Sequence, residues 1–242
     1  MLASRVLFLS YPKSGRTWVR FLMDAYLADL HGLELANVFE VERKLDRRWR
    51  IEWTHLTGAM IAGLPYDRIG EVDLSKIDGR PCVFLSRNLH ATLASAYFQA
   101  RDRVKVFEGT PSEFVRSPLF GIRKLVAFYN LVEELKGRFS SFTHLTYEGL
   151  REDPAAGLIA TLEVLGAEID PERVERAVRL GDIESLRRLA RSPEYADTAI
   201  APVDRDNPDS EKIRRGDDQA WRSLFDEDDV RYIDKVIAGH LV

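Results

Sequence analysis

Short apolar runs in this chain alternate with segments whose apolar residues recur every three or four positions. The apolar runs predict β-strands because each is bounded by turn-forming or charged residues; they cover 6–10, 51–55, 81–86 and 142–147. The helical spacing predicts helices over 17–31, 89–100, 111–136, 154–165, 171–180, 183–190 and 225–240, the third broken near Ser117-Pro118. Strands that alternate with helices predict an α/β fold, with a parallel sheet flanked by helices on both faces.

The composition is that of a globular protein with one hydrophobic core. The 242 residues fit a single domain over 1–242, and a chain with 45% hydrophobic and 31% charged residues has a usual balance. The net charge of −4 provides no global basic field, so we expect no nucleic-acid partner. Any anion site must therefore be built locally.

Cysteine usage and the start of the chain both bear on location. The single cysteine, Cys82, lies in a predicted strand, so no intrachain disulfide can form and a core role is expected. The first strand begins at residue 6 without a basic and apolar leader, and no apolar run is long enough to span a bilayer. We therefore expect a cytoplasmic protein that is neither secreted nor membrane-spanning.

The segment with the clearest chemistry follows the first strand. Its sequence, Tyr-Pro-Lys-Ser-Gly-Arg-Thr-Trp at 11–18, forms a tight turn between that strand and the first helix. A helix N-terminus presents unpaired backbone N–H groups and a partial positive charge to an anion. Lys13 adds a cation, while Ser14 and Thr17 add hydroxyl donors. We expect a phosphate cradle here, although the order differs from the Walker pattern G-x-x-x-x-G-K-[ST] because Lys13 precedes the single Gly15.

Two further segments carry groups that bind anions. Arg87 follows the predicted strand 81–86, and Ser95 lies on the next helix, so both can reach one phosphate. Later, Arg214 and Arg215 precede Gly216 in a charged segment with little apolar periodicity, where a basic pair can fold over a phosphate. Taken alone, the first segment is better explained by an exposed arginine at a strand end, and a solvated run of charges is a common alternative for the second.

Together, the three segments resemble the sulfotransferases that use 3′-phosphoadenosine 5′-phosphosulfate (PAPS), of the soluble type. Residues 11–18 are similar to that family's 5′-phosphosulfate loop, and Arg87-Asn88 with Ser95 are similar to its 3′-phosphate segment. Residues 214–216 with Trp221 match the family's Arg-Lys-Gly and its following Trp, except that Gln219-Ala220 replace Gly-Asp. The resemblance extends over about residues 6–225. It implies a P-loop-like sheet and transfer of a sulfuryl group from PAPS, which leaves 3′-phosphoadenosine 5′-phosphate (PAP).

The resemblance also implies a role for individual residues. His55, in Trp-Thr-His-Leu, stands where the family has the general base that takes the acceptor's proton. Lys13 would stabilise the leaving phosphate. The expected nucleotide contacts are Lys13, Ser14, Gly15, Arg16, Thr17, Trp18, Arg87, Ser95, Tyr147, Ser185, Arg214, Arg215 and Gly216. No metal is expected, because side-chain cations take its place.

Some positions depart from the family pattern. Trp53 stands where many members have a lysine two residues before the histidine, and Arg16 stands where a threonine or a small residue is usual. Either Lys13 or Arg16 replaces the lost cation, or Trp53 lines the acceptor pocket and the activity is specialised. Leu186, after Ser185, replaces an aromatic residue that contacts adenine in the family.

The acceptor is the least determined part of the reaction. We expect a small-molecule alcohol or phenol, and an amine less so. An apolar pocket could be built from Trp53, Tyr97, Phe98, Phe107 and Phe128. The basic residues at 43–44 and 47–48 form either a solvated helix face or an attraction for an acidic acceptor. The oligomeric state is open.

Two other functions compete with this interpretation. A P-loop nucleotide kinase would need a complete glycine-rich loop and a magnesium-binding aspartate at a strand end, whereas the strand before Arg87 ends in Ser86. A non-catalytic relative that only holds PAP is compatible with the departures at Trp53 and at 219–220.

Overall fold

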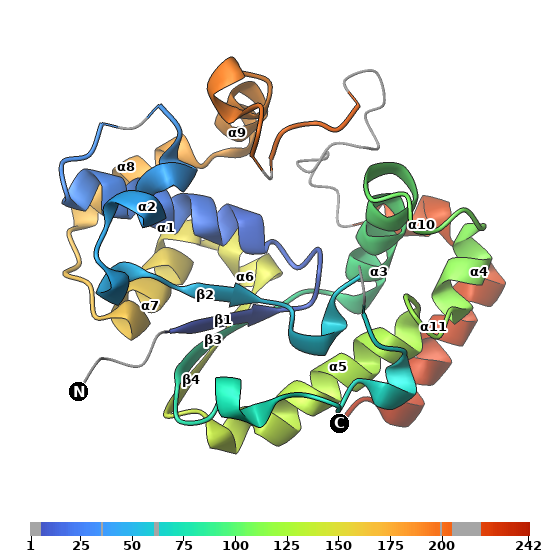
Figure 1. Ribbon diagram of the computed structural model, residues 1–242. Coiled ribbons are helices and arrows are strands. Elements are labelled where there is room, and N and C mark those ends of the chain that lie inside the picture. The colour runs from blue at the N-terminus through green and yellow to red at the C-terminus, as the bar shows by residue number, and fades with distance from the viewer. Residues whose placement is uncertain (1–5, 35, 61–62, 199, 205–218) are drawn as a thin grey trace.

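The computed structural model describes residues 6–34, 36–60, 63–198, 200–204 and 219–242. Its centre is a four-stranded parallel sheet in the order β2-β1-β3-β4 (Figure 1). The strands are β1 (Leu7–Ser10), β2 (Glu52–Thr54), β3 (Pro81–Ser86) and β4 (Ser141–Thr146). The predicted α/β fold with a parallel sheet is therefore confirmed.

Side-chain alternation along the two central strands supplies a core on each face of the sheet. Leu7 and Leu9 of β1 belong to one buried cluster, whereas Phe8 between them belongs to the other. The first cluster includes residues of α3 (Leu89–Phe98), α5 (Ile122–Leu135) and α11 (Glu227–His240). The second includes residues of α1 (Arg16–Leu30), α7 (Pro154–Leu165), α8 (Pro171–Leu180) and α9 (Ile183–Ala190). Helices thus cover both faces, as Figure 1 shows.

Most helices begin where the sequence offers a side-chain cap. Side-chain oxygens accept hydrogen bonds from backbone N–H groups at the starts of α3, α7, α8, α9 and α11, supplied by Asn88, Asp153, Asp170, Asp182 and Asp226. The predicted break near Ser117 is confirmed, since α4 (Pro111–Arg116) ends there and α5 starts at Ile122. The remaining short helices are α2 (Val41–Lys44), α6 (Tyr147–Glu152) and α10 (Trp221–Leu224).

The helix predicted over 89–100 differs in its last turn. The α-helical part ends at Phe98, and Gln99–Arg103 continue as a π-helix, with the N–H of Val104 bonded to the carbonyl of Gln99. A wider turn of this kind depends on packing rather than on residue spacing, so periodicity did not reveal it. Such π-turns often occur near functional sites.

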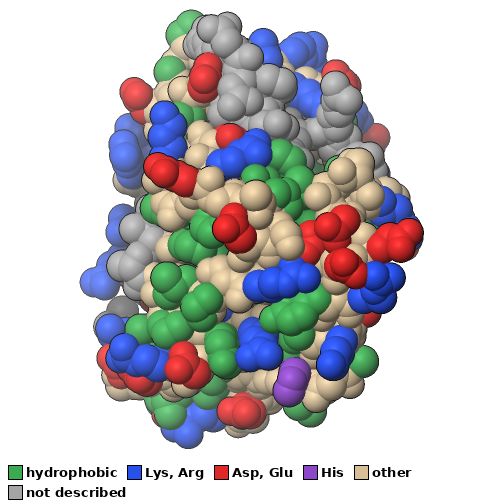
Figure 2. All heavy atoms as spheres, turned by 90° about the vertical axis from the view of Figure 1, so that its right-hand side faces the viewer, with side chains coloured by type: hydrophobic (Ala, Val, Ile, Leu, Met, Phe, Trp, Pro, Cys, Tyr) green, Lys and Arg blue, Asp and Glu red, His purple; other side chains and the backbone are tan. Residues whose placement is uncertain are grey.

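The surface is mixed in charge. On the face in Figure 2, Lys and Arg side chains are interspersed with Asp and Glu, and apolar atoms lie between them. Among the helices that the structure describes, none is both long and apolar enough to cross a membrane.

We predict that Tyr26→Phe loosens α1 from α8. The Tyr26 side chain is fully buried; its hydroxyl donates to the Glu168 carbonyl at 2.7 Å and accepts from the Asp170 N–H at 2.9 Å. Loss of the hydroxyl leaves both backbone groups without that partner, so the free energy of unfolding should fall by about 2 kcal/mol in urea titrations. Tyr66→Phe is the control, because its hydroxyl receives only a 3.4 Å contact from Arg123. Equal stability of both variants would contradict the prediction.

Candidate active site

The turn between β1 and α1 has an unusual backbone. Lys13 and Gly15 both have positive φ, 76° and 100°, and the lysine adopts this conformation against the preference of a residue with a Cβ. Gly15 is the N-cap of α1, where no side chain caps the helix and no acidic residue lies in the first turn. The helix N-terminus is thus available to an external anion, as the sequence predicts.

Tyr147 packs directly on this turn. A Cβ placed on Gly15 would lie 2.6 Å from Cδ2 of the Tyr147 ring, which no real side chain tolerates. Glycine at 15 is therefore required both by the backbone angle and by the ring. Tyr147, the first residue of α6, follows β4 directly.

Arg87 connects the same turn to β3. Strands β1 and β3 are parallel neighbours, with Ser10 paired to Leu85, so their carboxyl ends lie side by side. The Nη1 group of Arg87 donates to the Lys13 carbonyl at 3.1 Å, and its guanidinium lies 4.3 Å from the centre of the Tyr147 ring. The structure thus brings Lys13, Arg87 and Tyr147 together from three separate parts of the sequence.

Trp18 borders this group on the α8–α9 side. Its indole N–H donates to the Gly181 carbonyl at 2.9 Å, and its ring meets that of Tyr147 edge-on, with 6.1 Å between centroids. Ser185 lies four residues further on, in the first turn of α9, and its hydroxyl accepts a hydrogen bond from Arg188. Leu186, next to it, is buried in the core on the α1 side.

Sequence reasoning missed Gln99. The Nζ group of Lys13 donates to the Gln99 side-chain carbonyl at 3.2 Å. Ser95, the predicted phosphate contact, lies one turn earlier on α3 and is half-buried. Position 99 was not singled out because a glutamine on a helix has many roles, and only the path of the π-turn indicates that it faces Lys13.

His55 lies at the end of β2, next to β1. Its Nδ1 is 2.7 Å from the Ser10 carbonyl, which can only accept, so Nδ1 carries the proton and the lone pair resides on Nε2. Strand β1 therefore leads both to the anion turn and to the atom that orients the imidazole. This arrangement suits a general base.

Arg16 is a half-buried cation in the first turn of α1. Burial, with the nearby charge of Arg20 as a smaller cause, lowers the pKa of its guanidinium to about 10. Its Nη1 is buried and has no hydrogen-bond partner within the described part of the chain. An uncompensated buried donor beside an open helix N-terminus fits a bound phosphate or sulfate group.

Trp53 does not join the other aromatic residues of the expected pocket. It pairs with Phe8 in the sheet, 4.6 Å between ring centroids, and packs with the core on the α1 side. Tyr97, Phe98, Phe107 and Phe128 belong to the core on the opposite face. A pocket built from all five is therefore wrong, because alternation along β2 points Trp53 away from the other four.

The other residues that the sequence singled out lie away from this turn or outside the described residues. Arg214, Arg215 and Gly216 lie outside the described residues. The basic residues at 43–44 and 47–48 are exposed, as expected of a solvated face. Cys82 is buried as predicted, and burial raises the pKa of its thiol to about 12. Within the described ranges, no group of His, Cys, Asp and Glu side chains is arranged to hold a metal ion.

A model of the sulfotransferase domain matches residues 81–241, which is more than half of the chain. The protein belongs to the sulfotransferase family. Curated relatives extend the likeness to the N-terminal part. Bovine (Bos taurus) sulfotransferase 1A1 is 26% identical over 91% of this chain and 77% of its own length. Flavonol 3-sulfotransferase of Flaveria bidentis is 21% identical over 96% of this chain and 80% of its own length.

Solved sulfotransferase structures share the fold. Mouse sulfotransferase SULT7A1 complexed with PAP aligns with a TM-score of 0.64 and 18% identity, covering 98% of this chain and 84% of the mouse chain. Retinol dehydratase with androsterone and PAP aligns with a TM-score of 0.65 and 16% identity, covering 99% and 82%. The predicted family and P-loop-like fold of this sulfotransferase are thereby confirmed.

We predict that Gly15→Ala disrupts the anion turn of this sulfotransferase. The new Cβ would collide with Tyr147 and strain a left-handed backbone, so affinity for PAP should fall at least about 10-fold in calorimetric titrations. Gly32→Ala is the matched control: its φ is 62°, but nothing lies within 4 Å of the added Cβ. That variant should lose about 1 kcal/mol of stability and keep its affinity. Equal affinity of the two variants would refute the role given to Tyr147.

Proposed function

We propose that this sulfotransferase transfers a sulfuryl group from PAPS to a hydroxyl group of a small molecule, an amine being the less favoured acceptor. The observation that carries the proposal is the bond from His55 Nδ1 to the Ser10 carbonyl, which puts a basic imidazole at the root of the anion turn. PAPS would supply the activated sulfuryl group and leave as PAP.

The residues around the turn fit such a nucleotide. The open N-terminus of α1, the Ser14 side chain and the buried Nη1 of Arg16 suit the 5′-phosphate. Arg87 and Ser95 suit the 3′-phosphate, while Trp18 and Tyr147 offer aromatic surface for adenine. Two solved relatives of this fold were determined with PAP, which supports the same assignment.

His55 would act through Nε2. In the proposed reaction, the acceptor oxygen bonds to sulfur, its proton passes to Nε2, and the bond between sulfur and the phosphate oxygen breaks. The Ser10 carbonyl keeps the proton on Nδ1, so Nε2 is the acceptor, and it also favours the imidazolium that forms.

Lys13 would stabilise the charge that develops on the leaving phosphate oxygen. In the structure its ammonium is held by Gln99, a neutral partner that an anion can displace more easily than a carboxylate. Gln99 would then serve as the resting partner of Lys13. Because Trp53 carries no charge and its ring packs on Phe8 in the core, Lys13 and Arg16 would share the task of the family lysine.

The kinase and the non-catalytic alternatives each fit the site less well. A kinase needs carboxylate ligands for magnesium, whereas here β3 ends in Ser86 and an arginine follows. A non-catalytic PAP-binding protein has no need of a histidine held in one tautomer beside the turn. A cytoplasmic location and a single domain over 1–242 remain predictions.

Calorimetric titration with PAP, with ATP and AMP as controls, tests the nucleotide. We expect micromolar or tighter PAP binding that weakens at least about 10-fold in Arg87→Ala, because a charged donor at a phosphate is removed. Arg179→Ala should bind like the wild type, since among the described residues that exposed arginine forms an ion pair with Glu175 on its own helix alone. No PAP binding, or preference for ATP with Mg²⁺, would sink the proposal.

An acceptor screen tests the general base. In His55→Ala, turnover of any acceptor found should fall by about 10²–10⁴-fold while PAP affinity stays nearly unchanged. His240→Ala, at the exposed end of α11, should have no effect. If His55→Ala keeps wild-type turnover, the base is a different group. If the wild type turns over no acceptor, the result favours a protein that binds PAP without catalysis.

A further inference from the structure

A buried lysine lies beneath the segment that carries His55. Lys124, in the first turn of α5, is only 1% exposed. Its Nζ donates one hydrogen bond at 3.0 Å, to the carbonyl of Ala59. None of the described carboxylates lies within ion-pair distance of this ammonium, and burial lowers its pKa to about 8. Near neutral pH the group is therefore mainly cationic, with two N–H donors beyond the one that Ala59 accepts.

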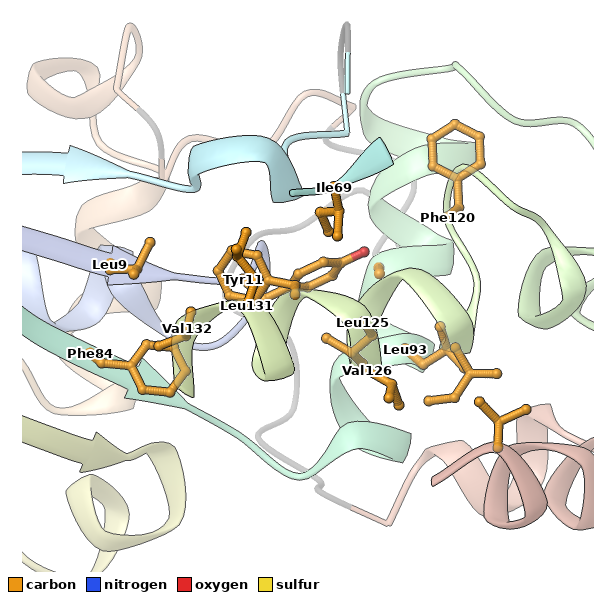
Figure 3. Packing of buried hydrophobic residues seen from close by; sticks show 14 of the residues in the cluster. Leu9, Tyr11, Ile69, Phe84, Leu93, Phe120, Leu125, Val126, Leu131 and Val132 are labelled. Atoms are coloured by element: carbon orange, nitrogen blue, oxygen red, sulfur yellow. The ribbon is translucent and has the colours of Figure 1, made fainter. Parts of the chain in front are cut away.

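This segment has a fixed structure that places the ammonium close to the reaction centre. His55 is the N-cap of a 3₁₀ turn at Leu56–Gly58, and Ala59 is its C-cap. A Cβ on Gly58 would lie 2.9 Å from Phe128 and 3.1 Å from Tyr11, so the turn packs tightly on α5. Tyr11 and Ile69 lie between α5 and the chain that follows β2 (Figure 3).

The short chain between His55 and Ala59 limits the separation between the backbones of these two residues. Four residues connect His55 to Ala59, and a fully extended chain of that length spans about 14 Å at most. A folded 3₁₀ turn is shorter. The Lys124 ammonium is thus bonded to the same short segment that begins with His55.

A purely structural role explains the lysine poorly. One neutral carbonyl returns less free energy than burying an ammonium costs, so an apolar side chain would serve the packing better. The Gly63 backbone lies beside the ammonium, and one turn further along α5 the rings of Tyr11 and Phe128 are in edge-to-face contact. The Lys124 ammonium, bonded among the described residues to the Ala59 carbonyl alone, would gain most from an anionic group that accepts its other two hydrogen bonds.

We propose that Lys124 determines acceptor specificity by binding an anionic group, such as a carboxylate, on the molecule whose hydroxyl is sulfated. This inference rests on the proposed function and narrows its acceptor class to hydroxy acids. The carboxylate accepts hydrogen bonds from the ammonium and undergoes no covalent change. The hydroxyl lies at His55, four residues before the Ala59 carbonyl that accepts from Lys124.

The test compares acids with their neutral esters. The probes are 3-(4-hydroxyphenyl)propanoate and 10-hydroxydecanoate, each against its methyl ester, titrated into the protein with PAP and then assayed for turnover with PAPS. We expect at least one acid to bind at least about 10-fold more tightly than its ester, as a charge-assisted pair should. In Lys124→Met that ratio should fall to about 1, whereas Lys124→Arg should keep part of it.

Controls separate this inference from the proposed function and from a folding defect. PAP affinity should be the same in wild type, Lys124→Met and Lys136→Met, the last removing an exposed lysine at the end of α5. If the wild type does not bind PAP, the proposed function is refuted. The affinities for acid and ester would then be measured on the protein without PAP. Two results overturn the inference: no acid preference in either pair, or an equal loss for acid and ester in Lys124→Met.

Discussion

The close contact between Gly15 and the Tyr147 ring is the constraint on which the anion site depends. It fixes the turn after β1 against the end of β4, although β3 lies between these strands in the sheet. Arg87, leaving β3, completes the group by stacking on the ring and bonding to the Lys13 carbonyl. The ends of β1, β3 and β4 therefore act as one unit, because a shift of any one of them would break its contacts with the other two.

The sequence predicted the residues of this unit better than their arrangement. Strand–turn–helix order placed Lys13 and Arg87 each after a parallel strand, and parallel strands share one carboxyl edge. That the two strands are neighbours is known only from the structure. Gln99 could not be predicted in this way, because its contact with Lys13 depends on a π-turn that leaves no periodic signal. The placement of Trp53 was misjudged for a related reason: its face is set by the register of β2 on β1.

The match to the family model covers only part of the candidate site. The domain match starts at β3 and thus includes Arg87 and Tyr147 but neither Lys13 nor His55. The roles that we propose for those two residues rest on geometry, namely the left-handed turn at Lys13 and the tautomer fixed by the Ser10 carbonyl. Both features arise from β1, whose last residue holds the His55 imidazole and whose following turn carries Lys13.

Two cations that have no carboxylate partner among the described residues, the half-buried Arg16 and the buried Lys124, distinguish this sulfotransferase from an ordinary α/β core. Arg16 lies at the N-terminus of α1, on one side of the sheet, and Lys124 lies on α5, on the other. Each has a pKa lowered by burial, so each costs free energy until an anion approaches. In the complex that we propose, one anion on the nucleotide side and one on the acceptor side would offset that cost. The proposed acceptor, acidic at one end and with a hydroxyl at the other, follows from this pairing of charges.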